Sequence, residues 1–346
     1  FQSARVNQLQ KVNDSTFNIT ITAENKPINS SAWFAFKVWG KPQKNVYVNL
    51  LYPNDKHRYQ PKTTIDGQQW QTLNEVKVSK EKTEASFKLQ LTKDTLTVAA
   101  QEMISSAQSY QWMDELTKQR GLVKTVIGHS IGGKPIIALN STKSDGKKIV
   151  VVLSRQHPPE ISGYMAMEQF VATLLGNTAL ARNFIKNYEL VIIPMLNPDG
   201  VDEGNWRHNF GGVDLNRDWI EFKQPETRAV RDYLLEKVKQ QDAKVYFALD
   251  FHSTFSDVLY TNEDRPDTNK PGLTKAWVKR LHDFEGAKKT TVKPSGNGGN
   301  VSKAWLGKVL NAEALTYEVG DNTPRPYIKQ KATKIAEVLM EELLKN

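Results

Sequence analysis

The chain has 346 residues, of which 39% are hydrophobic and 25% charged, a composition that suits one large domain plus a smaller one, or two medium domains. It contains no cysteine, which excludes disulfides, thiolate metal ligands and a cysteine nucleophile, so any metal must be held by nitrogen and oxygen ligands. The net charge of +9 is spread along the whole sequence, which favours a solvated basic surface over a nucleic-acid site and leaves acidic peptides or an anionic cell-envelope surface as partners.

The sequence shows no pattern of a membrane span or a signal peptide. No run of about 18 apolar residues occurs, and the first residues, FQSARVNQLQ, lack a basic segment followed by an apolar one. Because the chain begins with Phe and not Met, we expect either a removed leader or a trimmed end. Together with the absence of cysteine, this favours a periplasmic or secreted protein over a cytoplasmic one.

Residues 1–105 have the pattern of short strands. Phe17, Ile19 and Ile21 alternate with polar residues, which is the period of a half-buried strand. The segments WFAFKVWG (33–40) and NVYVNLLY (45–52) are aromatic and β-branched, and the apolar residues of 85–91 alternate again. Polar turns separate these segments. We therefore predict a small all-β antiparallel sandwich domain over residues 1–105.

From residue 106 to residue 346 the pattern changes to alternating helices and strands. The segment 106–120 is typical of a helix, and Gly121 suits its C-terminus. Near-continuous apolar runs predict strands that are buried on both faces, and amphipathic stretches between and after them predict helices. The strands are expected at 147–156, 189–196 and 243–251, and the further helices at 160–175, 225–240 and 328–343. This order predicts an α/β domain over residues 106–346.

Two histidines and a glutamate lie where predicted strands end. His157 follows the strand at 147–156, Glu160 comes three residues later, and His252 follows the strand at 243–251. In open α/β sheets ligands bind beyond the carboxyl ends of the strands. Two histidines with one carboxylate form the ligand set of a catalytic zinc ion that keeps one position open for water. Taken alone, however, each histidine could equally be a hydrogen-bonded residue at a strand end.

Six short motifs, taken in order, support the interpretation of these residues as a metal site. They are HPPE (157–160), NPDG (197–200), NWRHN (205–209), GVDLNRDW (212–219), DFHS (250–253) and TYEVG (316–320). In this order they resemble the carboxypeptidase A-like zinc metallocarboxypeptidases, from about residue 110 to the end of the chain. The resemblance implies a mixed-sheet catalytic domain flanked by helices, with one zinc ion per chain.

The resemblance also implies roles around the metal. His157, Glu160 and His252 match the zinc ligands, and Asp214 matches the carboxylate that orients a ligand histidine. Glu318 matches the general base, which takes a proton from zinc-activated water and passes it to the leaving amine.

Three further residues match the groups that bind the substrate. Asn216 and Arg217 match the pair that grips the terminal carboxylate, and a guanidinium suits this role because it binds a carboxylate through two hydrogen bonds. Arg207 matches the residue that polarises the scissile carbonyl and stabilises its oxyanion. Taken singly, Asp214 and Asp218 could cap turns, and Arg217 could form a structural salt bridge.

The chain departs from the digestive members of the family. These carry a mobile tyrosine about twenty residues before the general base, whereas the only tyrosine in GNGGNVSKAWLGKVLNAEALTY is Tyr317, so that role is assigned to no residue. The β-rich start of the chain, with WFAFKVWG and DGQQW (66–70), resembles the cytosolic carboxypeptidase branch, whose members often remove acidic C-terminal residues. Lys303 is a candidate for binding such an acidic side chain, and the alternative is a solvated lysine on a helix.

The leading functional hypothesis is hydrolysis of the C-terminal peptide bond of a peptide or protein. A related alternative is a zinc amidohydrolase acting on cell-wall peptides or N-acyl amino acids. A third is a binding module that has kept the fold without catalysis, but such a protein is expected to have lost a ligand or the base. We expect no nucleic-acid partner and no membrane span, and the sequence leaves the oligomeric state open.

Overall fold

The computed structural model describes residues 1–287, 289–295 and 299–345. The chain divides into two compact units. The first comprises residues 1–106 together with 157–161 and 199–212, and the second comprises residues 107–156, 162–198 and 213–346. The predicted domain boundary between residues 105 and 106 stays a prediction. No helix in the described ranges is both long and apolar enough to cross a membrane.

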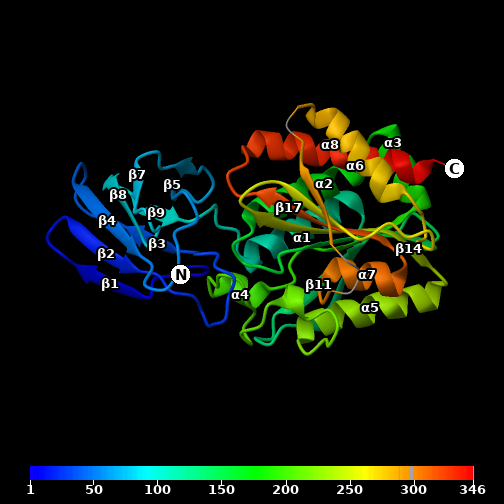
Figure 1. The fold of residues 1–346 in the computed structure, drawn as a ribbon, viewed down its shortest axis with the longest axis horizontal. Helices are drawn as coiled ribbons and strands as arrows, with labels where there is room; N and C mark the ends of the chain where they lie inside the picture. The colour runs from blue at the N-terminus through cyan, green and yellow to red at the C-terminus, as the bar shows by residue number, and fades with distance from the viewer. Residues whose placement is uncertain (288, 296–298, 346) are drawn as a thin grey trace. The chain divides into compact units, whose positions relative to one another are not determined.

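The strands of residues 1–105 form two sheets in the described chain (Figure 1). One has the order β1-β2-β4-β8-β7 and the other the order β3-β9-β5-β6. All pairs are antiparallel except β2 with β4, which run parallel. The arrangement is consistent with the predicted sandwich, with this one parallel pair as the exception. The strands are β1 (Gln8–Lys11), β2 (Thr16–Thr20), β3 (Ala35–Val38), β4 (Asn45–Leu51), β5 (Lys62–Thr64), β6 (Gln71–Thr72), β7 (Val76–Val78), β8 (Glu84–Gln90) and β9 (Leu96–Ala99).

The core of this β region follows from the alternation in its sequence. Val48 of β4 lies opposite Phe87 of β8, and both side chains are buried. Tyr47 and Lys88, one position along, are paired in the same register and face solvent. Because side chains point to opposite faces at successive residues, alternating apolar residues put a complete apolar row on the inner face.

The second unit is built on a mixed sheet of eight strands with the order β10-β11-β13-β12-β14-β17-β15-β16. Its central strands β13, β12, β14 and β17 run parallel to one another, and antiparallel pairs join β11 and β15 to them. The predicted α/β fold with a mixed sheet is therefore confirmed. The strands are β10 (Val123–His129), β11 (Pro135–Asn140), β12 (Lys148–Ser154), β13 (Glu189–Ile193), β14 (Lys244–Thr254), β15 (Val258–Thr261), β16 (Thr291–Pro294) and β17 (Glu313–Gly320).

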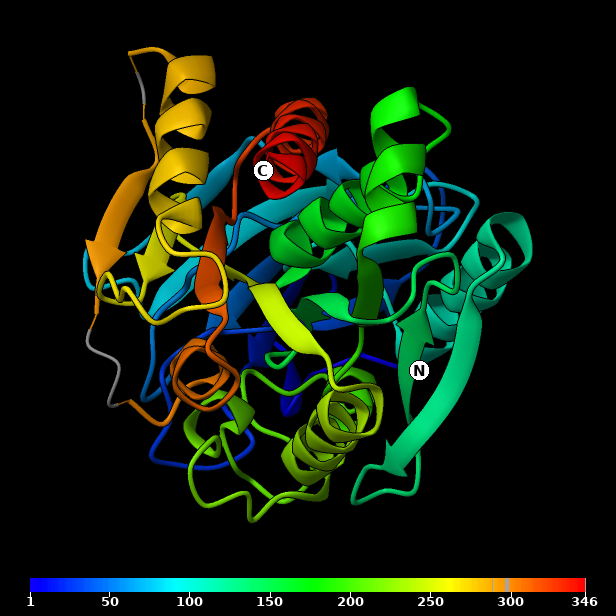
Figure 2. The same ribbon diagram turned by 90° about the vertical axis from the view of Figure 1, so that its right-hand side faces the viewer.

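Helices cover both faces of this sheet. Figures 1 and 2 show α2, α3, α6 and α8 on one face and α5 and α7 on the other. The helix α1 ends at Arg120 as predicted, and Gly121 follows with a positive φ of 65°, the left-handed conformation that glycine adopts readily. The helices are α1 (Ser106–Arg120), α2 (Ile161–Leu174), α3 (Ala179–Asn187), α4 (Pro198–Asp202), α5 (Pro225–Gln241), α6 (Leu273–Glu285), α7 (Ser302–Leu310) and α8 (Arg325–Leu344), with a 3₁₀ turn at Leu215–Arg217.

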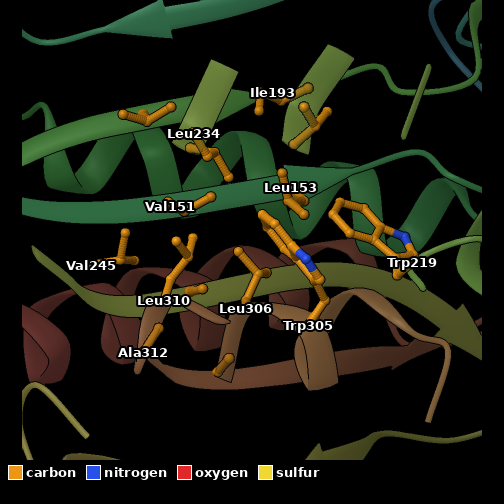
Figure 3. Packing of buried hydrophobic residues seen from close by; sticks show 14 of the residues in the cluster. Val151, Leu153, Ile193, Trp219, Leu234, Val245, Trp305, Leu306, Leu310 and Ala312 are labelled. Atoms are coloured by element: carbon orange, nitrogen blue, oxygen red, sulfur yellow. The ribbon is translucent and has the colours of Figure 1, made fainter. Parts of the chain in front are cut away.

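The face under α5 and α7 holds a continuous apolar core (Figure 3). Val151 and Leu153 of β12 contribute to it, together with Leu234 of α5 and Leu306 of α7, all of them buried. Near the end of β12 the core becomes aromatic, where Trp219 lies against the ring of Trp305 at 5.7 Å between centroids. This packing fixes the sheet and both helices beneath the carboxyl ends of β14 and β17, where His252 and Glu318 lie.

Candidate zinc and substrate site

Three buried side chains form a group that could hold a metal ion. They are His157, Glu160 and His252, and one potential ligand atom from each lies within 4.8 Å of the others. His157 Nδ1 is 2.8 Å from Glu160 Oε1, so these two are already adjacent. Two imidazoles and one carboxylate are borderline nitrogen and oxygen donors without a thiolate, the set that suits catalytic zinc. The three residues predicted from the sequence as ligands thus fit the metal.

The strand β14 sets the direction in which His252 points. The prediction placed this histidine after the strand, but β14 extends to Thr254 and contains it. An irregularity at Tyr246 shifts the register with β12, so that Val245 and Ala248 both face the core under α5 and α7. Beyond Ala248 the alternation continues, and it places Asp250 and His252 on that same face.

A glycine allows α2 to approach His252 closely. A Cβ atom at Gly163 would lie 2.2 Å from the backbone oxygen of His252, so any side chain there would force the helix away from the strand. Gly163 N donates to Ser253 Oγ at 2.8 Å, and Ser162 Oγ donates to the same oxygen at 2.9 Å. These contacts fasten the beginning of α2 to the end of β14, a requirement that the sequence did not reveal.

Asp250 orients His252, the predicted metal ligand, and was not predicted from the sequence. Its Oδ2 accepts from His252 Nε2 at 2.9 Å and from Gln156 Nε2 at 2.5 Å, and the Ser302 hydroxyl donates to it as well. A carboxylate only accepts, so it fixes the proton of His252 on Nε2, which would leave Nδ1 to hold a metal ion. The Asp-x-His spacing within a strand could have revealed this pair, because residues two apart share a face.

Asn216 and Arg217 lie in the 3₁₀ turn next to this network. Asn216 Oδ1 accepts from Ser302 N at 2.9 Å, and its Nδ2 lies 3.5 Å from His252 Nε2. The amide is therefore held with its oxygen toward α7, which leaves the NH₂ group as its donor side. Arg217 is exposed, and its Nη1 donates to Asn216 O at 2.7 Å. In the described chain its guanidinium forms no salt bridge, which argues against a structural ion pair.

The two aspartates of the same motif cap local structure. Asp214 Oδ1 accepts from Asn216 N at 2.9 Å and caps the 3₁₀ turn. Asp218 accepts from the backbone amides of Lys223 at 2.9 Å and Gln224 at 2.8 Å, which leads the chain into α5. The capping alternative therefore applies to both. For Asp214 it does not conflict with the predicted contact to a ligand histidine, which stays a prediction.

Arg207 lies in a segment without regular structure and is buried, with 8% of its surface exposed. Its backbone amide donates to Glu24 Oε1 at 3.0 Å, so the segment is held by a residue far away in the sequence. The predicted role of its guanidinium toward a substrate carbonyl stays a prediction.

Glu318 lies directly beside His252 in the sheet. The two residues are register partners on the parallel strands β17 and β14, so their side chains share a face. Val258 of β15 is the partner of Glu318 on the other side, and Tyr260 lies diagonally across from it. Burial, and after it the charge of Glu318, raise the pKa of Tyr260. Tyr260 is therefore a phenol near the predicted base, and it lies outside the interval in which the family pattern led us to expect a tyrosine.

The far side of β17 is held by a buried ion cluster. Lys331 Nζ lies 2.5 Å from Asp257 Oδ2 and 2.6 Å from Glu285 Oε1. Asp257 Oδ1 accepts from Gly320 N at 2.7 Å, and Tyr317 donates to Oδ2 at 3.1 Å. Burial raises the pKa of Asp257, but the Lys331 ammonium and these hydrogen bonds outweigh it, so the pKa lies below its ordinary value. The cluster fixes the residues on both sides of Glu318.

Lys303 is buried in α7, with only 2% of its surface exposed. The alternative of a solvated lysine on a helix is therefore wrong. Its ammonium donates to Asn262 Oδ1 at 2.9 Å, Ser295 O at 3.1 Å and Thr261 O at 3.2 Å. None of these acceptors is charged, and burial lowers the pKa of Lys303 to about 8. Within the described residues the cation has no carboxylate partner.

A comparison with protein families decides what this arrangement represents. The model of the zinc carboxypeptidase family, peptidase M14, matches residues 109–321. The chain belongs to the zinc carboxypeptidase family. The metallocarboxypeptidase class and the zinc cofactor predicted from the motifs are thereby confirmed, since members of this family are zinc-dependent hydrolases.

Curated relatives and solved structures agree with the family. The chain is 23% identical to mouse cytosolic carboxypeptidase 3 over 78% of its length, which is 30% of that protein. It is 31% identical to cytosolic carboxypeptidase 6 of Caenorhabditis elegans over 41% of its length, 33% of that protein. The chain thus spans a third or less of these two relatives.

Among solved structures, a metallo-carboxypeptidase from Burkholderia cenocepacia has a TM-score of 0.82 at 18% identity, covering 99% of this chain and 97% of that one. One from Pseudomonas aeruginosa has a TM-score of 0.78 at 20% identity, covering 99% and 98%. At this identity the similarity establishes the fold, and it includes the β-rich start of the chain.

Proposed function

We propose that the chain is a zinc-dependent carboxypeptidase that removes the last residue of peptides or proteins. The observation that carries this proposal is the Asn216–Arg217 pair beside His252. The Asn216 NH₂ group lies at the ligand histidine, and the Arg217 guanidinium is exposed. Two adjacent donors for an anion suit the terminal carboxylate of a peptide, and gripping that carboxylate restricts hydrolysis to the last peptide bond.

The other residues have consistent roles in hydrolysis. When bound, zinc supplies Lewis acidity and makes water nucleophilic near neutral pH. We assign Glu318 as the general base that takes the proton of the attacking water and donates it to the leaving amine. Its position beside His252 in register supports this assignment. We assign Arg207 to the developing oxyanion, where a fixed cation stabilises the transition state.

We further propose a preference for acidic C-terminal residues, supported by Lys303. This residue follows Ser302, whose backbone amide and hydroxyl contact Asn216 and Asp250. Its buried charge has only neutral acceptors in the described chain, so a carboxylate on the substrate side chain would supply the missing counter-charge. The three N–H donors of the Lys303 ammonium already have acceptors, so we expect its charge to attract the substrate carboxylate. A direct hydrogen bond to that carboxylate would replace the bond to one of the three present acceptors.

A panel of peptides tests both proposals. Peptides ending in Glu, Leu or Lys, each with a free or an amidated C-terminus, are incubated with the zinc-loaded protein and followed by mass spectrometry. We expect loss of one residue from the free acids, fastest for Glu, and no cleavage of the amides. Cleavage of amidated peptides at equal rates would reject the carboxypeptidase proposal, and faster release of Leu or Lys would reject the acidic preference. Hydrolysis of muropeptides or N-acyl amino acids in place of peptides would support the amidohydrolase alternative.

A further inference from the structure

A glutamate near the start of the chain holds the segment that carries Arg207. Glu24 follows β2, and its carboxylate accepts three successive backbone amides. Oε2 accepts from Trp206 N at 2.8 Å, and Oε1 accepts from Arg207 N at 3.0 Å and His208 N at 2.8 Å. All four residues belong to the first compact unit. One carboxylate thus fixes the peptide planes on both sides of Arg207.

Neighbouring residues fasten the two ends of the same segment. Asn25 Oδ1 lies 2.6 Å from His208 Nδ1, and Asn25 Nδ2 donates to Gly212 O at 2.9 Å. At the other end, Arg5 Nη1 lies 3.2 Å from Asn205 Oδ1 and 3.3 Å from Gly204 O. Residues of the β-rich start therefore contact the segment 204–212 at its beginning, middle and end.

The segment depends on these contacts because it lacks regular secondary structure. Between Asn205 and Val213 the described chain forms no helix or strand, so its amides have no ladder or helix partners. Buried backbone donors need acceptors from elsewhere. Hydrogen bonds to an ionised carboxylate are about twice as strong as neutral ones. Glu24 therefore supplies much of what holds the Arg207 backbone in one conformation.

We propose that Glu24 is a positioning residue for Arg207, and that the β-rich start of the chain thereby takes part in catalysis. The inference rests on the proposed role of Arg207 in the transition state. A catalytic group displaced by about 1 Å can cost on the order of 100-fold in rate. A guanidinium whose backbone is no longer fixed loses alignment with the oxyanion, and the loss falls on kcat because substrate is bound by other residues.

Glu24→Gln is the sharpest substitution. It keeps the size and one acceptor oxygen but places an NH₂ donor against a backbone N–H, most directly that of Trp206. We expect kcat to fall about 10- to 100-fold, with KM within about twofold and zinc content unchanged. Glu75→Gln, at an exposed position of the same unit, is the matched control and should change none of these values. Unchanged kcat in Glu24→Gln would overturn the inference.

A double substitution separates positioning from a general structural role. In an Arg207→Ala background, Glu24→Gln should lower kcat by less than about twofold, because the group it positions is gone. The same fractional loss in both backgrounds would show that Glu24 acts independently of Arg207, and would reject the inference. Asn25→Ala removes two contacts to the same segment without touching the carboxylate, and should lower kcat about threefold, so it provides the test if Glu24→Gln does not fold.

Hydrogen exchange keeps this inference distinct from the proposed function. The amides of residues 206–208 should exchange at least about tenfold faster in Glu24→Gln than in the unsubstituted protein, while those of β12 and β14 stay protected. If exchange at 206–208 is unchanged, Glu24 does not position the segment, whatever the activity. If exchange rises as expected but the unsubstituted protein cleaves no peptide, the proposed function fails, and with it the catalytic part of the inference.

Discussion

Replacement of Asp250 by Asn tests how the sheet holds His252, the predicted metal ligand. Asp250 is fully buried, and His252, Gln156 and Ser302 all donate to its Oδ2. Its Oδ1 has no hydrogen-bond partner among the described residues. Asn has the same shape but no charge, and it must place an NH₂ group at one of these two positions. Either orientation weakens the arrangement around His252.

The size of the effect follows from these contacts. If the amide oxygen takes the Oδ2 position, bonds to a charged acceptor, worth about 1.5–3 kcal/mol each, become neutral bonds of about 0.5–1.5 kcal/mol. The bond to His252 alone then loses about 1–2 kcal/mol. Since about 1.4 kcal/mol corresponds to a factor of ten, the zinc dissociation constant should rise about 5- to 30-fold. The unpartnered NH₂ group at the Oδ1 position should also lower the thermal stability.

The assay is a competition titration of zinc against a chromophoric chelator at fixed pH, with thermal unfolding of the metal-free protein measured in parallel. Asp283→Asn, an exposed substitution in α6, is the matched control and should leave both quantities unchanged. If Asp250→Asn binds zinc within about twofold of the unsubstituted protein, the reasoning that this carboxylate orients His252 is refuted.

Three further predictions concern the substrate site. Glu318→Gln should retain zinc but lose about 10²- to 10⁴-fold in kcat, measured on a peptide with a free C-terminus, because an amide cannot accept the proton; activity within tenfold of normal would remove Glu318 as the base. Arg217→Lys should raise KM for free-acid peptides by about tenfold with zinc binding unchanged, because a single ammonium replaces the guanidinium fork; an unchanged KM would contradict the terminal-carboxylate grip. Because the pKa of Lys303 is lowered to about 8, its ammonium is charged below that pH and neutral above it, so the preference for Glu over Leu should be full near pH 7 and decline as the pH rises through about 8; a ratio of kcat/KM that stays constant up to about pH 9 would contradict a role for this charge.

The sequence determined those features that depend on neighbours along the chain. Alternation predicted a strand at 85–91, aromatic and β-branched residues predicted one at 45–52, and the apolar runs predicted the buried central strands; the pairing of β4 with β8 came only from the structure. The glycine after α1 marked its end. The metal ligands could be predicted because HPPE and DFHS resemble motifs of the family and keep their residues at fixed short spacings. Such local patterns can be recognised in a single sequence because each depends on a period or a turn that neighbouring residues specify.

The tertiary structure decided which residues support the site, because those contacts join segments far apart in the chain. Nothing near Glu24 in the sequence indicates that it accepts the amides of residues 206–208, more than 180 positions away. Nothing around Lys303 indicates that its ammonium is buried among neutral oxygens. Hydrogen bonding and desolvation depend on what surrounds a group in space, so they follow only when the sheet and its loops have folded. The sequence alone determined the motifs that indicate the family and the predicted zinc ligands; only the fold showed which residues hold the predicted ligand His252 in place.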